Sequence, residues 1–252
     1  MKITRREFAA SALSAAVLPS ALAASAAEDG LRLRFLGTGA ADWNGPDERG
    51  ECRRLTSALL DGKILIDLTP GDLEMLPAGV RPDVIFYTHS HGDHYNPASA
   101  LRLGIGKAYV HASWAASHAT RRPGEEAAMY LVTKGPTRLL YATDTAGIPA
   151  VAARIAGIDA HAKGDGITAL VMEATMGVGH ADDFRIFAHS SVDTVARIAR
   201  VLQATERYRP RFPDQKIWLT HMARTLHGSQ KEIEQGVPAP LAPAYDGLEV
   251  VL

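Results

Sequence analysis

The stretch Thr88-His89-Ser90-His91-Gly92-Asp93-His94 follows a short apolar run and decides the class of this chain. In an extended segment, the first two histidines alternate and therefore point to the same side. The glycine permits a sharp turn that brings the aspartate and the third histidine toward the same space. These four side chains suit Zn, Mn or Fe(II), and they exceed what one tetrahedral site takes from a single loop. The stretch therefore predicts a site for two metal ions.

The segments around this stretch alternate between strand and helix patterns. Asp61-Gly62 is a strong two-residue turn, and it predicts a hairpin between two of the strands. Helical spacing predicts helices at 149–156 and 192–204. Apolar runs predict strands at 31–36, 56–60, 63–67, 84–88, 128–133, 138–143, 167–173, 216–220 and 248–252. This order predicts an α/β domain over residues 28–252, with sheets covered by helices.

Composition excludes several classes of protein. The 252 residues are 46% hydrophobic and 22% charged, a balance that argues against a disordered, collagen-like or coiled-coil chain. A formal charge of −1 supplies no general attraction to nucleic acid or anionic membranes. Cys52 is the only cysteine, which excludes an intrachain disulfide and a multi-cysteine zinc site. We expect Cys52 to be a small, partly buried apolar residue and not a nucleophile.

Residues 1–27 have the pattern of a signal peptide. Arg5 and Arg6 precede an uncharged, alanine-rich run from Phe8 to Ala27. The string Thr4-Arg5-Arg6-Glu7-Phe8 resembles a twin-arginine signal, which exports folded proteins. A retained membrane anchor is the alternative interpretation. This segment predicts the twin-arginine export machinery as a partner and a periplasmic or otherwise extracytoplasmic location.

The histidine-rich stretch, with its spacing His-x-His-x-Asp-His, resembles the metallo-β-lactamase fold and its two-metal hydrolases. Three further segments resemble parts of that fold: Leu36-Gly37-Thr38-Gly39-Ala40-Ala41, the run 141–147, and Leu219-Thr220-His221. The run 144–149 and Tyr245-Asp246-Gly247 are similar to cyclic-phosphate phosphodiesterases of phosphonate breakdown and to pyrroloquinoline quinone synthesis B proteins. Ribonuclease Z is a more distant relative. The resemblance implies an αββα sandwich of two mixed β-sheets covered by helices.

The resemblance also implies a metal-ligand set. One ion would take His89 and His91, the other would take Asp93, His94 and His221, and Asp144 would bridge them. The first ion needs one more histidine, for which His118 is preferred over His111. The cofactors would be two divalent ions, zinc with manganese as the alternative. The full predicted set is His89, His91, Asp93, His94, His118, Asp144 and His221.

Other residues receive roles in catalysis or substrate binding. Asp93 and His189 are the predicted catalytic residues, with His189 donating a proton to the leaving oxygen. In the alternative interpretation, His189 merely lies beside a helix cap. Glu173 is expected to orient a ligand histidine. His180, Arg224 and His227 are predicted substrate contacts, although His180 is equally compatible with a solvated loop.

Together these features predict an exported two-metal hydrolase, most simply a phosphodiesterase. A hydroxide between the metals would attack a phosphodiester or cyclic phosphate in line. A carbonyl hydrolase acting on a lactone, thioester or β-lactam is one alternative, and a non-catalytic metal-binding accessory protein is another. The expected partner is a small-molecule phosphodiester and not a stable nucleic acid. A homodimer is compatible with the sequence.

Overall fold

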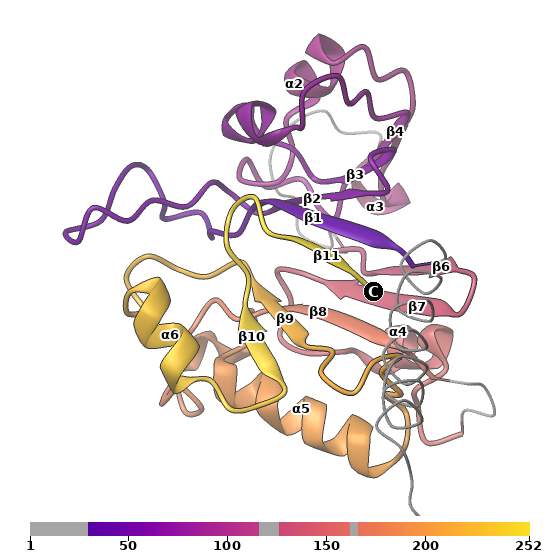
Figure 1. Cartoon of the computed structure of the whole chain (residues 1–252), viewed down its shortest axis with the longest axis vertical. Helices are drawn as coiled ribbons and strands as arrows, with labels where there is room; N and C mark the ends of the chain where they lie inside the picture. The colour runs from indigo at the N-terminus through magenta and orange to yellow at the C-terminus, as the bar shows by residue number, and fades with distance from the viewer. Residues whose placement is uncertain (1–29, 116–125, 162–165) are drawn as a thin grey trace, which may run out of the picture.

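Two β-sheets pack face to face in this computed structural model, which describes residues 30–115, 126–161 and 166–252 (Figure 1). The predicted signal segment 1–27 and the predicted ligand His118 lie outside these residues. Figure 1 shows α2 on the outer side of one sheet, with α4, α5 and α6 on the outer side of the other. This arrangement confirms the predicted sandwich of two mixed sheets and helices.

The first sheet has six strands in the order β11-β1-β2-β3-β4-β5. Strands β1, β2, β3 and β11 pair antiparallel, whereas β3, β4 and β5 are parallel. Its strands are β1 (Arg32–Gly37), β2 (Ser57–Leu60), β3 (Ile64–Ile66), β4 (Val84–Phe86), β5 (Ala108–Tyr109) and β11 (Glu249–Val251). The helices of this half are η1 (Pro70–Met75), α2 (Pro97–Arg102) and α3 (Ala112–Ala115).

The second sheet has five strands in the order β10-β9-β8-β7-β6. Only the β6–β7 pair is antiparallel, and β7 to β10 run parallel. Its strands are β6 (Tyr130–Lys134), β7 (Thr137–Ala142), β8 (Ala169–Glu173), β9 (Ile217–Thr220) and β10 (Leu241–Pro243). The helices are α4 (Ala150–Ala156), η2 (Phe184–Phe187), α5 (Val192–Ala204) and α6 (Gln230–Gly236).

Alternation along the central strands builds three hydrophobic cores. In β7, Leu139 and Tyr141 enter the core between the sheets, and Leu140 enters the core beneath α5. In β2, Leu60 lies between the sheets, whereas Leu59 faces the outer core on the α2 side. Because both faces of these strands are buried, their sequences are continuous apolar runs and do not alternate with polar residues.

Local sequence signals agree with the predicted elements. Asp61 and Gly62 both have positive φ, of 48° and 69°, as a tight hairpin turn between β2 and β3 requires. The predicted strands and the helices α4 and α5 are present within a few residues of their expected bounds. The sequence patterns did not predict α2, α6 or β10.

Two further findings concern exposure. Cys52 is exposed, so the expectation that it is partly buried is wrong. It lies on the segment that leads into β2 and belongs to none of the three hydrophobic cores. Among the described residues, no helix combines the length and the apolar character needed to cross a lipid bilayer.

Candidate metal centre

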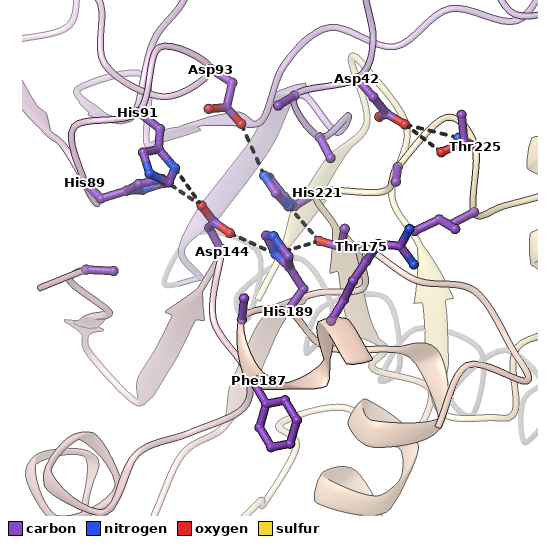
Figure 2. Close-up of a pocket in the computed structure, with 17 residues that line it drawn as sticks. Asp42, His89, His91, Asp93, Asp144, Thr175, Phe187, His189, His221 and Thr225 are labelled. Carbon is purple, nitrogen blue, oxygen red and sulfur yellow. Dashed lines mark hydrogen bonds and ion pairs between the residues drawn. The ribbon is translucent and has the colours of Figure 1, made fainter. Parts of the chain in front are cut away.

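The histidines and carboxylates of the predicted site lie where strands end. His89 and His91 follow β4, Asp144 follows β7, and His221 follows β9. Within each sheet, the carboxyl ends of the parallel strands lie at the same end of the sheet. The loops that follow these strands in the two sheets meet at the site (Figure 2). In Figure 2, Asp93 and the β4 histidines approach from one side and Asp144 and His221 from the other. They line an open cavity of about 640 Å³.

Backbone conformation is unusual in this site. Asp67, Asp144 and His221 have φ values of 57°, 49° and 53°, in the left-handed region that few non-glycine residues adopt. The described residues contain only two others of this kind, Asp61 and Glu206. Such conformations persist where the surrounding structure compensates for them, which is common at functional sites. Here the left-handed turns aim Asp144 and His221 into the cavity at the ends of β7 and β9.

One group of candidate ligands consists of His89, His91 and Asp144. The Nε2 atom of His89 lies 2.7 Å from Asp144 Oδ2. The Nδ1 atom of His91 lies 3.4 Å from the same oxygen. The three ligand atoms are close enough together to hold one ion.

A second group lies beside the first, around Asp93. The Oδ2 atom of Asp93 is 3.4 Å from His94 Nε2 and 3.5 Å from His221 Nε2. The ring centres of His89 and His94 are 4.2 Å apart, and those of His94 and His221 are 5.1 Å apart. Six of the seven predicted ligands therefore meet in one cluster with two neighbouring centres.

In each buried histidine of the cluster, the Nδ1 atom has a hydrogen-bond partner on a neighbouring side chain. Asp67 Oδ2 lies 2.7 Å from His94 Nδ1, and Thr175 Oγ1 lies 2.8 Å from His221 Nδ1. Thr88 Oγ1 lies 3.0 Å from His89 Nδ1 and donates to Asp67 at 2.7 Å. Partners of this kind fix the ring orientation and the tautomer of metal-binding histidines.

The inner nitrogens of the same histidines provide a test of whether metal fits. Within the described parts of the chain, the buried Nε2 atoms of His89, His94 and His221 make no hydrogen bond. They approach carboxylate oxygens, but not in hydrogen-bonding geometry. Buried polar atoms nearly always have partners, so three orphaned nitrogens in one cluster require an explanation. Coordination of cations by these nitrogens and by the adjacent carboxylates supplies it, so the residues fit the predicted ions.

Electrostatics favour the same interpretation. Burial opposes ionisation of Asp144, but its close contacts with His189, His89 and His91 hold its pKa well below the usual range. Burial also disfavours charge on His94, yet Asp67 raises the pKa of His94 to about 9. Burial also disfavours charge on His221, but the carboxylates of Asp93 and Glu173 raise its pKa to about 10. The buried carboxylates thus keep their charge and require positive charge beside them.

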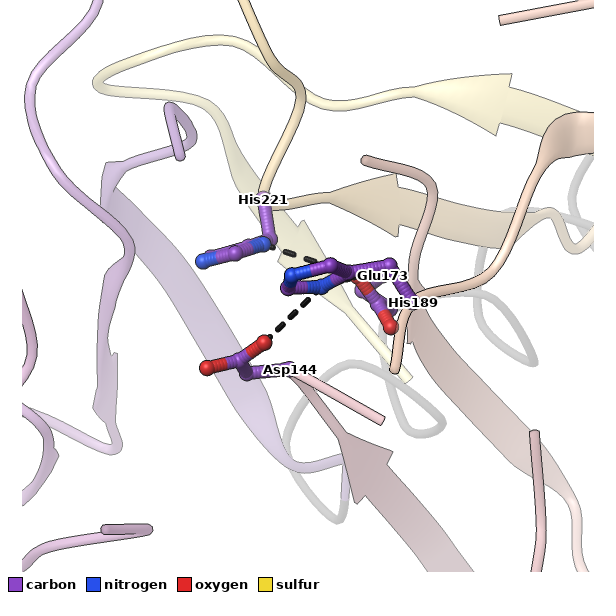
Figure 3. A group of neighbouring side chains, drawn as sticks. All are labelled: Asp144, Glu173, His189 and His221. Atoms are coloured by element: carbon purple, nitrogen blue, oxygen red, sulfur yellow. Dashed lines mark hydrogen bonds and ion pairs between the residues drawn. The ribbon is translucent and has the colours of Figure 1, made fainter. Parts of the chain in front are cut away.

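His189 and Glu173 adjoin the cluster from the second sheet (Figure 3). His189 Nδ1 lies 2.9 Å from Asp144 Oδ1 and 3.2 Å from Glu173 Oε2. Hydrogen bonds with Asp144 and then Glu173 raise the pKa of His189 to about 9. The fully buried Glu173 also accepts the hydroxyl proton of Thr175 and the amide protons of Thr145, at 2.7 Å, and Ser190, at 2.9 Å. Its contact with His221 runs mainly through Thr175.

The structure places the three predicted substrate contacts away from the lining of this cavity. Arg224 donates to Asn44 and to the carbonyl of Pro46. His227 is mostly buried, and its Nε2 atom lies 2.6 Å from the carbonyl oxygen of Ala174. His180 lies on the loop beyond β8, 3.5 Å from Asp183. None of the three is among the described residues that line the cavity.

Other residues take the positions expected for substrate contacts. Arg185 and Phe187 of η2 line the cavity, as do Asp42 and Thr225. Asp67 and Thr175 were also missed as supports of the cluster. The sequence carried a signal only for Asp67, a carboxylate at the end of the predicted strand 63–67. The other contacts depend on loops whose course the sequence pattern did not predict.

The third histidine of the first group stays a prediction. His111 is partly exposed, with Nδ1 2.9 Å from Ser113 and Nε2 3.8 Å from Glu126. It lines a neighbouring hollow and belongs to neither ligand group. His118 lies outside the described residues.

Comparison with known proteins identifies the fold. No protein-family model and no curated protein sequence matches the chain. Three solved structures are similar over most of both chains. A diphosphatase from the PhnP family matches 88% of this chain and 97% of its own, with 19% identity and a TM-score of 0.58. The metallo-β-lactamase fold protein YhfI from Bacillus subtilis matches 89% and 100%, with 14% identity and a TM-score of 0.59.

The third similar structure is the short form of human tRNase Z. It matches 87% of this chain and 98% of its own, with 16% identity and a TM-score of 0.54. The protein therefore has the metallo-β-lactamase fold, as the histidine-rich stretch predicted. At these identities the similarity defines the fold, and the activity has to be argued from the site.

Proposed function

We propose that this protein is a hydrolase that uses two divalent metal ions to cleave phosphodiesters. The observation that carries the proposal is a cluster of three buried Nε2 atoms that make no hydrogen bond, on the rings of His89, His94 and His221, whose Nδ1 atoms are each held by a neighbouring side chain. One ion would be held by His89, His91 and Asp144, with His118 as the further predicted ligand. The other would be held by Asp93, His94 and His221, with Asp144 between the two.

Donor chemistry and the known neighbours support this function. Imidazole and carboxylate ligands suit zinc, with manganese as the alternative. When bound, two such ions supply Lewis acidity and make water nucleophilic near neutral pH. The similar proteins include a diphosphatase and a tRNase Z, which fits action on phosphorus rather than carbonyl carbon.

In this proposal, the chain itself provides a proton donor next to the ligands. His189 is 28% exposed at its side chain and lines the cavity, so it is accessible to substrate. Its contacts with Asp144 and then Glu173 raise the pKa of the ring, which favours the protonated form. When Asp144 serves as a metal ligand, Glu173 remains to hold Nδ1, which leaves Nε2 to protonate the departing oxygen.

We also propose that the chain is exported, on the twin-arginine pattern of residues 1–27. Export of a folded protein suits an enzyme that acquires its metal during folding. A small extracytoplasmic phosphodiester is then the natural substrate class. Amino-terminal sequencing of protein recovered from the periplasm tests this part separately, because an intact Met1 in the cytoplasm would contradict it.

Metal analysis followed by a substrate panel tests the catalytic proposal. We expect about two zinc or manganese ions per mature chain and turnover of bis(p-nitrophenyl) phosphate, with Asp144→Ala as the inactive control. Turnover of lactones or chromogenic cephalosporins, but not of the diester, would show a carbonyl hydrolase. Bound metal without turnover of any ester would favour the accessory protein.

A further inference from the structure

One segment at the mouth of the cavity has no role in the proposed chemistry. This rim segment, residues 183–188, contains η2 and leads directly into His189. Phe187 and Phe184 are 87% and 76% exposed, an unusual state for phenylalanine. Phe187 and Arg185 both line the cavity. Figure 2 shows Phe187 on the opposite side of His189 from Asp93, so the ring can contact only a remote part of a substrate.

Arg185 is held in a defined orientation. Its Nη1 atom donates to Asp183 Oδ2 at 2.8 Å, and its guanidinium carbon lies 4.8 Å from the centre of the Phe184 ring. The Asp183 side chain also accepts the Arg185 backbone N–H at 2.9 Å. An arginine has five N–H donors, and the contact with Asp183 engages one of them. The remaining donors are available to an anion, with little rotamer freedom left to lose.

The rim segment is tied to the reacting centre through its backbone. The carbonyl oxygen of Arg185 accepts the amide protons of Ala188 and His189, both at 2.8 Å. The position of the rim relative to the His189 ring is therefore set by the fold. A group bound at the rim would therefore lie next to His189 along the cavity wall.

Charge in the cavity restricts what the rim can bind. The acidic side chains of the cavity are Asp42, Asp93 and Asp144. Arg185 is the only lysine or arginine among the described lining residues. An anionic group that does not meet the metal cluster therefore has one favourable partner, and an exposed aromatic ring lies two residues away from it.

We infer that the rim segment binds the leaving portion of the substrate, with Phe187 stacking on an aromatic ring and Arg185 pairing with a second anionic group. The inference rests on the proposed function and narrows its substrate class. The preferred substrate is a phosphoester or phosphoanhydride whose leaving portion carries both an aromatic ring and an additional negative charge.

Calorimetric binding to the zinc-loaded, mature protein tests this inference without requiring turnover. The probes are ADP, AMP and inorganic pyrophosphate, which separate the ring from the second charge. We expect wild type to bind ADP more tightly than AMP. Arg185→Met should weaken ADP binding about 10-fold or more and remove the preference over AMP. Phe187→Ala should weaken ADP and AMP about 5-fold or more, with little effect on pyrophosphate.

Matched controls lie on α2, outside the cavity. Leu101 is 75% exposed and Arg102 is also exposed, so Arg102→Met repeats the arginine change and Leu101→Ala truncates a comparably exposed apolar side chain, both outside the cavity. Both should bind ADP as wild type does. Wild-type affinity for ADP in both rim variants overturns the inference, as does equal binding of ADP and AMP by wild type. Conversion of a dimer to a monomer by Phe187→Ala, with ADP affinity unchanged, would show that the rim is a contact between copies.

Turnover of bis(p-nitrophenyl) phosphate by the same wild-type preparation separates the two proposals. If wild type hydrolyses the diester but the rim variants bind every probe normally, the inference fails and the proposed function stands. If wild type hydrolyses no diester but the rim variants lose ADP affinity as expected, the proposed function fails and the rim is still a ligand site.

Discussion

Asp67 in the first sheet and Glu173 in the second are both fully buried carboxylates beneath the same cluster, but they support it differently. Asp67 follows β3 and contacts His94 directly at 2.7 Å. It also accepts the backbone N–H of Thr88 and its hydroxyl proton, each at 2.7 Å. The side-chain partners of Asp67, which are Thr88 and His94, are both buried.

Glu173 serves two histidines with different exposure. It reaches the buried His221 mainly through the Thr175 hydroxyl, and it contacts the partly exposed His189 at 3.2 Å. It also binds the backbone of the Thr145 and Ser190 loops. In the proposed function, the first sheet would therefore supply a support for metal binding alone. The second sheet would connect metal binding to the placement of the proposed proton donor.

The largest effect is expected at Asp144, where the two halves meet. Asp144→Ala removes the carboxylate of the first ligand group, which is also proposed to contact the second ion and which lies 2.9 Å from His189. We expect loss of bound metal and a fall in diester kcat/KM that exceeds the roughly 10²–10³-fold cost of removing a single transition-state contact. Elemental analysis and diester kinetics check this. Cys52→Ser, an exposed change outside the cavity, is the control, and equal behaviour of the two variants would contradict the assignment.

His189→Ala tests whether the second sheet supplies the proton donor. We expect a loss of about 10²–10³-fold on an alkyl phosphodiester, because a poor leaving group needs a proton. The loss should be much smaller on a p-nitrophenyl diester, and the metal content should be retained. Equal losses on both substrates would remove the proton-donor role and leave His189 beside the α5 cap.

Asp67→Asn and Glu173→Gln compare the two supports directly. Asn at position 67 cannot hold His94 in the same way, and we expect about 10- to 100-fold weaker metal binding. Glu173→Gln should weaken metal binding less, since Thr175 intervenes, but should reproduce part of the leaving-group dependence of His189→Ala. Zinc competition titrations and kinetics on both leaving groups distinguish them. Identical profiles for the two variants would show that the supports are equivalent.

The smallest effect is expected from His227, behind the strand that carries Glu173. Burial lowers the pKa of His227 from 6.5 to about 4, so the folded state holds the ring neutral. Its stabilising contribution is complete above pH 6.5 and is lost as the pH falls toward 4. In metal-free protein between pH 7 and 5, wild type should lose about 2 kcal/mol more unfolding free energy than His227→Gln. Urea unfolding at both pH values measures this, and parallel pH profiles would contradict it.

Local sequence predicted the elements of this site whose geometry is local. His89, His91, Asp93 and His94 lie within one turn after a strand, so their spacing alone brings them together. Asp144 and His221 were predicted from the resemblance of their segments to the metallo-β-lactamase fold. The structure brings both side chains into one cluster, whereas their role as ligands stays a prediction that metal analysis will test.

The substrate side of the cavity was not predictable in the same way. Arg224 and His227 lie three residues apart and close to His221 in sequence, yet the loop after β9 turns them to Asn44, Pro46 and Ala174. Arg185 and Phe187 line the cavity instead, from a short 3-10 helix with no periodic signal.

Within the sequence, apolar periodicity and turn chemistry determined the α/β class, the hairpins and the strands, because they act over a few neighbours. The resemblance carried by the histidine-rich stretch added the sandwich fold. Only the tertiary structure decided which buried groups support those residues. Asp67 meets His94 across 27 positions and Thr175 meets His221 across 46. Contacts at such separations depend on how two sheets and their loops pack, and no local pattern specifies that packing.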